Sequence, residues 1–344
     1  MPQPFRWGKP RATLVGVSVV AESRGTTRWG RLKLPPLPEL PATRSGRVLL
    51  AAQAAVLLAM TGTVATRTWQ DHTWFGFLLV ALAFALWLPE VRQRRIRRWW
   101  FVYVAGIFVY TLLRAYADEA GAPVRVAYPI SFDRWLFFGT DPTPWLQRRF
   151  FDPRDIGLLD YLAVATHWSF FVAPHALAVG VFVLQRRHFP RFALLTVGTM
   201  WLGLILFFIV PTAPPWFASE VGELAGVRRI MDYVGGSIHG SAYSSLYAAL
   251  GEPNSVAAMP SIHMAVTFAM YLWGRRHLPR LAPLLLAYCG VMAVSLVYLG
   301  EHYVADLLAG VACAVAAWLA AVRFAPELIE PPRLPADTGS RRLS

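Results

Sequence analysis

The chain has 344 residues, of which 56% are hydrophobic and only 15% are charged, and its net charge is +13. Soluble globular domains have about 25% charged residues, so this composition excludes an ordinary soluble domain and indicates a protein that crosses a membrane several times. No soluble basic face is apparent, so nucleic acid is not an expected partner. Cys289 and Cys313 both fall in apolar stretches, which argues against a disulfide framework or a thiolate metal site.

Eight apolar stretches follow one another along the chain, and crossing a bilayer takes about 20 helical residues. They are 47–66, 73–89, 99–116, 160–184, 192–210, 260–275, 281–299 and 302–322, of which 73–89 is short. Their apolar character is continuous and lacks the alternation of β-barrel strands. The sequence therefore predicts an all-α, polytopic membrane helix bundle with about eight transmembrane helices.

Basic residues indicate how these stretches are oriented. The N-terminal segment is rich in Lys and Arg and lacks the features of a cleaved signal peptide, so we expect it to stay in the cytoplasm. Further arginines fall after every second stretch, at 92–98, 186–191, 275–280 and 323. Short cytoplasmic loops carry such an excess of positive charge. The pattern predicts a multi-pass protein of the plasma or cell membrane with both termini in the cytoplasm.

Two short segments place a histidine at the start of an apolar stretch, both on the predicted extracytoplasmic side. The first is Pro260-Ser261-Ile262-His263, where Ser261 suits a helix N-cap and the positive helix end favours an anion such as phosphate. The second is 300–306, where Asp306 follows His302 at i+4 and can orient its ring. One histidine can attack a phosphorus atom while the other protonates the leaving oxygen. His302, His263 and Asp306 are therefore the candidate catalytic residues, although each segment alone could be structural.

These residues resemble the type 2 phosphatidic acid phosphatase (PAP2) superfamily, whose second motif is PSGH and whose third is SRxxxxxHxxxD. Here the third motif runs from Ser295 to Asp306, and its arginine position holds Leu296. The proline-rich PTAPPW at 211–216 stands where the first motif, KxxxxxxRP, is expected. This combination, with 132–139 and 144–147, is similar to the aureobasidin-sensitive inositol phosphorylceramide synthase branch and its bacterial relatives. The resemblance implies an inositolphosphotransferase-like enzyme of lipid metabolism and leaves its substrate open.

Without the family's arginines, other groups must bind the phosphate. The candidates for substrate binding are Ser261, Arg228, Arg229, Trp216 and His167. The two arginines lie in the loop before PSIH, and a solvated or headgroup-facing surface is the alternative for them. Trp216 could form an apolar lid that keeps water out, or be one anchor of an interfacial aromatic belt. His167 could complete the site, or be a hydrogen-bonded histidine of the bundle.

Four regions are expected from composition and motifs. They are a disordered, basic and proline-rich cytoplasmic tail (1–44), N-terminal transmembrane helices with an extracytoplasmic loop (45–157), a PAP2-like catalytic membrane domain (158–323) and a cytoplasmic tail (324–344).

The expected function is phosphotransfer on lipid phosphoesters through a phosphohistidine at the extracytoplasmic face, with head-group transfer favoured. A lipid phosphate or polyprenyl pyrophosphate phosphatase uses the same chemistry and stays an alternative, as does a non-catalytic transporter or scaffold. The expected partners are a membrane lipid substrate, an alcohol or lipid acceptor and the bilayer. No cofactor is expected, because no carboxylate cluster suited to Mg²⁺ is evident. The oligomeric state is left open.

Overall fold

The computed structural model describes residues 41, 43–66, 78–79, 82–83, 85–87, 94–115, 123–237 and 257–325, and these residues form helices and connecting loops. Within these ranges there is no strand; two isolated bridges join Arg125 to Thr212 and Thr212 to Ala257. The expected all-α class is therefore confirmed. The tails 1–44 and 324–344 lie almost wholly outside the described residues, and so does most of the predicted span 73–89.

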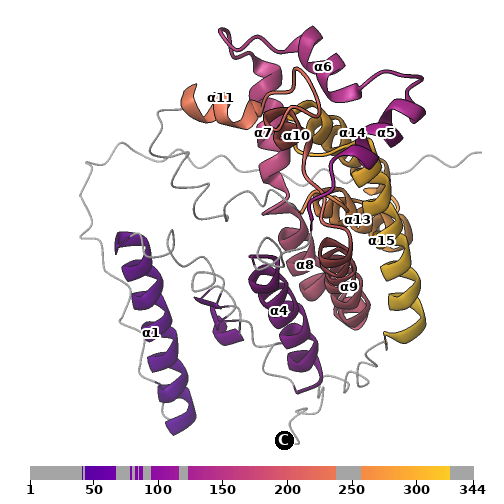
Figure 1. The fold of residues 1–344 in the computed structure, drawn as a ribbon. Helices are drawn as coiled ribbons and strands as arrows, with labels where there is room; N and C mark the ends of the chain where they lie inside the picture. Colours follow the sequence, from indigo (N-terminus) through magenta and orange to yellow (C-terminus); the bar gives the residue numbers. More distant parts are fainter. Residues whose placement is uncertain are drawn as a thin grey trace, which may run out of the picture.

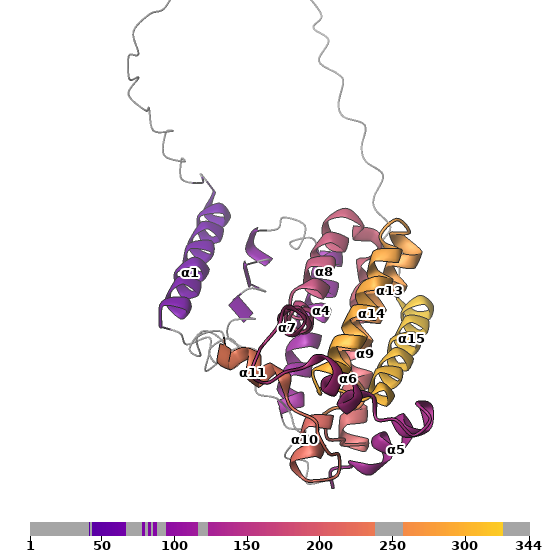
Figure 2. The ribbon, with the colours of Figure 1, turned by 90° about the horizontal axis from the view of Figure 1, so that it is seen from above.

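A bundle of long helices forms the body of the molecule. Its members are α4 (Arg94–Ala115), α7 (Leu158–Ser169), α8 (Ala173–Leu184), α9 (Phe189–Ile209), α13 (Ile262–His277), α14 (Ala282–Tyr298) and α15 (Val304–Phe324). Helix α9 packs against α4, α13 and α15, and α13 also packs against α14 and α15. Helix α1 (Arg44–Thr66) stands apart from this bundle in both ribbon views (Figures 1 and 2). The two histidine motifs therefore begin helices, α13 and α15, that are neighbours in the bundle.

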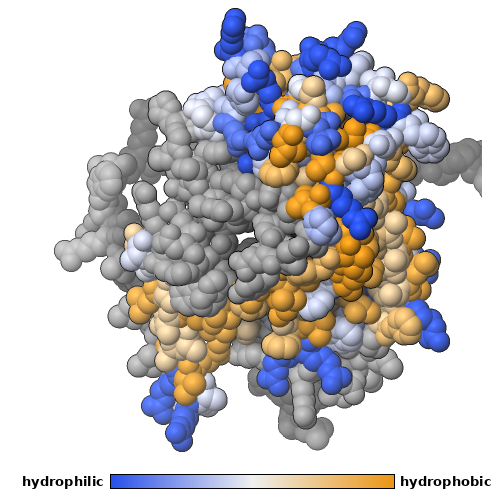
Figure 3. Space-filling model, viewed as in Figure 1, coloured by the Kyte–Doolittle hydropathy of each residue, from blue (hydrophilic) through white to orange (hydrophobic). Residues whose placement is uncertain are grey.

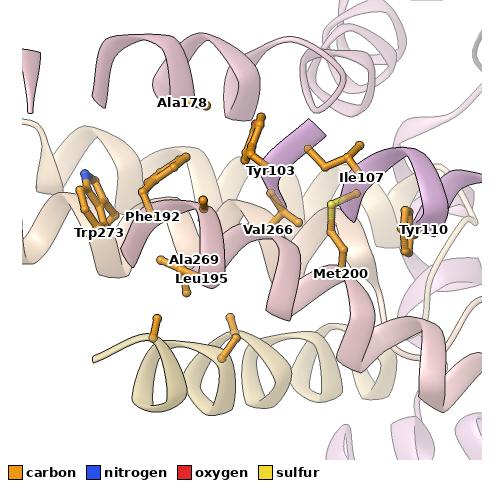
Figure 4. Packing of buried hydrophobic residues seen from close by; sticks show 14 of the residues in the cluster. Tyr103, Ile107, Tyr110, Ala178, Phe192, Leu195, Met200, Val266, Ala269 and Trp273 are labelled. Atoms are coloured by element: carbon orange, nitrogen blue, oxygen red, sulfur yellow. The ribbon is translucent and has the colours of Figure 1, made fainter. Parts of the chain in front are cut away.

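The core of the bundle is apolar and lies around α9. Phe192 and Leu195 of α9 are buried together with Trp273 of α13 and Tyr103 of α4, as Figure 4 shows. Phe192 and Trp273 meet edge to face, with their ring centroids 5.1 Å apart. Close packing of this kind fixes the helices relative to one another. It gives the histidine motifs at the helix ends a rigid support.

Fewer helices qualify as membrane spans, judged by length and composition, than the sequence predicts. Among the described residues four helices qualify: Arg44–Thr63, Ile96–Arg114, Arg186–Ile209 and Val304–Phe324. A fifth span results if the bent pair α7 and α8 is taken as one. Helices α13 and α14 have 16 and 17 residues, which is short for a bilayer of ordinary thickness. About eight spans therefore remains a prediction.

The predicted continuous span 160–184 is broken. Helix α7 ends at Ser169, α8 begins at Ala173, and the two are bent by 43°. Pro174 lies in the first turn of α8, where its missing N–H and ring interrupt a continuing helix. The break lies beside Phe170 and Phe171, whose rings contact His263. Pro174 was visible in the sequence and is the physical reason for the bend.

The two ends of the bundle differ in structure. At one end lie the short helices α5 (Ala127–Leu136), α6 (Pro142–Phe150), α10 (Pro215–Glu220) and α11 (Ile230–Ser237), at the top of Figure 1. At the other end η3 (Arg186–His188) meets the end of α13, where the rings of His188 and His277 are 4.7 Å apart. This contact brings two of the basic loops together. Between the hydrophilic residues at the top and bottom of Figure 3 lies a largely hydrophobic band.

Candidate active site

His302 and Asp306 are held at the first turn of α15. Asp306 is fully buried, and its Oδ2 accepts a hydrogen bond from the backbone N–H of Tyr303 at 2.8 Å. The same oxygen lies 3.4 Å from Nδ1 of His302, whose side chain is also buried. When Nδ1 is turned to a carboxylate, Nε2 is the ring nitrogen left for chemistry. The i+4 spacing thus brings an imidazole and an orienting carboxylate together.

The start of α13 is fixed against that first turn. Ser261 is the N-cap of α13, because its Oγ accepts a hydrogen bond from the N–H of Met264 at 3.3 Å. The N–H of Ser261 donates to the carbonyl of Asp306 at 3.0 Å. Gly310 allows this close approach, since a Cβ there would lie 2.5 Å from the carbonyl oxygen of Ser261. His263 therefore enters the site from a helix start that is tied to α15.

Three histidines gather at this place. The ring centroid of His263 lies 5.8 Å from that of His302 and 4.4 Å from that of His167 on α7. The ring centroid of Phe170 lies 4.4 Å from that of His263. Nε2 of His263 and Nδ1 of His167 are buried and make no hydrogen bond within the described part of the chain. Buried polar atoms normally have a partner, so both nitrogens are available to an oxygen of a substrate.

Of the two candidate arginines, Arg229 is the one near the histidines. Its Nε donates to Oε1 of Glu301 at 3.0 Å, and its guanidinium lies 4.8 Å from the ring centre of Trp216. The N–H of Trp216 donates to the carbonyl of Gly300 at 3.0 Å, which anchors this loop directly before His302. The charge of Arg229 acts on His167, so the guanidinium lies within electrostatic range of the histidine cluster.

Arg228 faces elsewhere. Its side chain is exposed, and its guanidinium donates to the hydroxyl of Tyr233 at 2.7 Å. The position of the family's third-motif arginine, Leu296, is fully buried in an apolar cluster with Met264 and Met292. An arginine there would place a charge among apolar side chains, so this position supplies no cation to the site.

Two side chains of the short helices α5 and α6 hold the loops of the site. Gln147 of α6 is buried; its Nε2 donates to the carbonyls of Arg228 and Tyr298, each at 2.8 Å, and its Oε1 accepts from the N–H of Arg228 at 2.8 Å. Asp133 of α5 is buried and accepts hydrogen bonds from the N–H groups of Val304 and Ala305 at 2.9 and 3.0 Å. Helices α5 and α6 are thus attached to the ends of α15 and α14.

Sequence reasoning did not identify Asp133, Gln147 or Glu301 as parts of the site. The available signal was a polar side chain inside a short aromatic segment, as in 132–139 and 144–147, which were noted only for their resemblance. Among the described residues no group of three or more His, Cys, Asp and Glu is arranged to hold a metal ion.

Comparison with known protein families matches residues 130–320 to the PAP2 superfamily. The match covers more than half of the chain and includes most of α5, all of α6 and both histidine motifs. The chain therefore belongs to the PAP2 superfamily, as the resemblance of its motifs predicted.

Two curated proteins have sequences that are similar to this chain. A phosphoinositol dihydroceramide synthase of Bacteroides thetaiotaomicron is 28% identical over 203 residues, which are 51% of this chain and 64% of that protein. The catalytic subunit of inositol phosphorylceramide synthase of Saccharomyces cerevisiae is 30% identical over 164 residues, 44% of this chain and 39% of that protein. The chain thus spans less than two thirds of the length of either relative. No solved structure matches it.

Proposed function

We propose that the protein is an integral membrane phosphotransferase that moves an inositol-phosphate-like head group from a donor lipid to an alcohol or lipid acceptor. The observation that carries the proposal is the pair of histidine rings 5.8 Å apart, with Asp306 placed behind His302. The names of both relatives support the inositol-phosphate head group, since each is called a synthase of an inositol-phosphate-bearing ceramide.

The first half-reaction uses the two histidines in different roles. Nε2 of His302 attacks the phosphorus of the donor lipid, so that a P–N bond forms and the P–O bond to the lipid alcohol breaks. His263, protonated on the imidazole, gives its proton to the departing alkoxide, which leaves as a neutral alcohol. Asp306 keeps the proton of His302 on Nδ1 and stabilises the positive charge of the phosphorylated ring. Proton transfer of this kind contributes about 10²- to 10⁴-fold in rate.

The second half-reaction reverses these roles. His263, now neutral, takes the proton of the acceptor hydroxyl, whose oxygen attacks the phosphorus while the P–N bond breaks. The head group then resides on the acceptor, and both histidines return to their starting protonation. Water in place of the acceptor gives hydrolysis, which is the phosphatase alternative.

The negative charge that develops on phosphorus needs fixed cations and donors. Arg229 is proposed for this role because it lies beside the loop that carries His302, held by Glu301 and the ring of Trp216. His167 and Ser261 are proposed as further substrate contacts, His167 through its unpaired ring nitrogen and Ser261 through its place at the start of α13.

The reaction is proposed to take place at the extracytoplasmic face. The basic loops at 186–191 and 275–280 meet at the end of the bundle opposite to α5 and α6, and short basic loops usually stay in the cytoplasm. Phe138, between α5 and α6, is 99% exposed, and Cys289 and Cys313 are buried. A cysteine at Phe138 should therefore react with an impermeant thiol reagent in intact cells. A cysteine at the exposed Arg280 is the matched control, and labelling of the control alone would reverse the orientation.

Transferase and phosphatase are distinguished by the product. Purified protein is incubated with head-group-labelled phosphatidylinositol, polyprenyl phosphate or phosphatidic acid, with and without long-chain alcohol acceptors. The proposal expects label on the acceptor. Label released only into water with every acceptor supplied, as inositol phosphate from phosphatidylinositol or as phosphate from the phosphomonoesters, would establish the phosphatase.

The role of Trp216 is tested by the same assay. The side chain is half-buried and packs near Tyr303 and Ala305 at the start of α15. If its ring keeps water from the phosphohistidine, Trp216→Ala should raise the ratio of hydrolysis to transfer, while total consumption of substrate falls only modestly. An unchanged ratio would leave Trp216 as an interfacial anchor.

A further inference from the structure

The helix that carries Asp306 begins with N–H groups that need acceptors. Backbone N–H groups in the first turn of a helix have no partner inside the helix and attract oxygen atoms and negative charge. At the start of α15 the first two of these donors are the N–H groups of Val304 and Ala305. Both are satisfied by Asp133, whose Oδ2 and Oδ1 accept them at 2.9 and 3.0 Å. A residue 171 positions earlier in the chain thus caps the catalytic helix.

The second carboxylate at this helix start is Asp306 itself. Its Oδ2 is shared between the N–H of Tyr303 at 2.8 Å and Nδ1 of His302 at 3.4 Å. Its Oδ1 is buried and makes no hydrogen bond within the described residues. The side chain is therefore held by one oxygen only. If the N–H groups of Val304 and Ala305 lost their acceptor, the carboxylate of Asp306 would be the nearest anion able to turn toward them.

We propose that Asp133 is a positioning residue, which occupies the N-terminal donors of α15 so that the carboxylate of Asp306 stays with His302. The inference rests on the proposed function, because it assigns Asp133 a share in catalysis by that pair. Asp133 makes no contact with the histidines itself. It acts through the direction of the Asp306 side chain and the place of the helix end.

The surroundings of Asp133 argue against a cap that serves stability alone. The carboxylate is 2% exposed and lies beside Ile130, Tyr303 and Ala305. Burial, with a smaller contribution from Asp306 and Asp141, raises its pKa to about 6. Its neighbour Arg134 pairs with Asp141, at 2.8 Å, so among the described residues the charge of Asp133 is met by the two N–H groups of α15 and by no ion pair. Ser, Thr or Asn would cap a helix with a single side-chain oxygen and without burying a charge, whereas the two oxygens of Asp133 satisfy the N–H groups of Val304 and Ala305 together.

The test is a double-mutant cycle between Asp133→Asn and Asp306→Asn, measured by head-group transfer. Asp133→Asn should lower kcat by about 10- to 100-fold, the effect of a misplacement of about 1 Å at a reacting group, with KM changed by less than about twofold. If Asp133 acts through Asp306, the double variant should be no more than about threefold slower than Asp306→Asn alone. Asp141→Asn, which removes a carboxylate of the same hairpin that does not touch α15, is the matched control and should keep wild-type kcat.

The outcomes separate the inference from the proposed function. Additive losses in the cycle, or a loss confined to KM, would overturn the positioning role. Wild-type activity in Asp306→Asn would instead refute the proposed catalytic pair. If Asp133→Asn does not fold, Asp133→Ser, which replaces the carboxylate by a smaller neutral group, takes its place in the same cycle.

Discussion

The starts of α13 and α15 each position one of the two candidate catalytic histidines, but the two helix starts are held in different ways. Helix α13 is capped by its own neighbour in the chain, Ser261, and is fixed by direct backbone packing at Gly310. Helix α15 is capped by two carboxylates, of which one comes from α5. His263 is therefore held by local structure and close packing, whereas His302 and Asp306 depend on a contact between distant parts of the chain. Changes in packing should act on both histidines, and changes in α5 should act chiefly on His302.

The largest effect is expected from the histidines themselves. His302→Ala and His263→Ala should each lower the rate of head-group transfer by at least about 10²- to 10⁴-fold, since each removes a separate step. Asp306→Asn should be damaging but less complete, because it disturbs only the orientation and tautomer of His302. The matched control is His175→Ala, which removes a half-buried histidine of α8 whose Nδ1 lies 2.9 Å from the hydroxyl of Tyr103. Near-normal turnover in either site variant would refute the assignment.

Gly310→Ala should separate the two helix starts. Its Cβ would meet the carbonyl oxygen of Ser261 at 2.5 Å and the backbone N of Ala265 at 3.2 Å, and neither can turn away as a side chain can. We expect kcat to fall by about tenfold or more, because a shift of about 1 Å at a reacting group can cost 10² in rate. Gly290→Ala, whose Cβ would meet nothing within 4 Å, is the control. Equal activity of the two variants would contradict the tight crossing.

Gln147→Ala should weaken the extramembrane end of the molecule. It removes three hydrogen bonds and leaves the carbonyls of Arg228 and Tyr298 without their side-chain donor. A buried polar group that loses its partner costs about 1–3 kcal/mol, so the free energy of unfolding should fall by about 2–4 kcal/mol. Gln185→Ala removes a single hydrogen bond to His277 at the opposite end and should cost less than about 1 kcal/mol. Thermal unfolding in detergent compares the two variants. A smaller loss of stability in Gln147→Ala than in Gln185→Ala would contradict the stabilising role of the three Gln147 hydrogen bonds.

The smallest expected effect is on how the stability of the folded protein depends on pH. Because burial raises the pKa of Asp133 to about 6 from 3.8, the unfolded chain ionises this group before the folded protein does. Ionisation of the Asp133 carboxylate therefore lowers the free energy of unfolding by roughly 1–3 kcal/mol as the pH rises from about 4 to 6. Asp133→Asn lacks this loss, so its unfolding temperature relative to the wild type should rise between pH 4.5 and pH 7.5. A difference that is constant over this window would contradict a raised pKa.

The sequence contained enough to predict what is local. Motif spacing placed His302 beside Asp306 and both motifs at helix starts, and continuous apolar stretches predicted an all-helical protein. Contacts between distant segments were not predictable in this way, because nothing in the period of a single helix says that Asp133 meets Val304 or that Gln147 meets Tyr298. The bend before α8 is different: Pro174 signalled it, but the long apolar run dominated the interpretation.

Among the substrate-binding candidates the structure separates Arg229 from Arg228, which the sequence could not do. Adjacent residues in a loop point in different directions, and only Arg229 has Glu301 and Trp216 to hold it. Leu296 is instructive in the same sense, because it is fully buried and so contributes packing and no polar group at the motif position where the family has an arginine.

The cap of α15 by Asp133 also has a consequence for biosynthesis. The carboxylate is made 171 residues before the N–H of Val304 that it binds. At about 5–20 residues per second, the ribosome needs roughly 10–30 seconds to cover this distance. During that interval α5 has been synthesised but its partner has not, and His302 and Asp306 do not yet exist. Helix α15 is synthesised after the other described helices, so the proposed catalytic pair of His302 and Asp306 is complete only once this helix has been made.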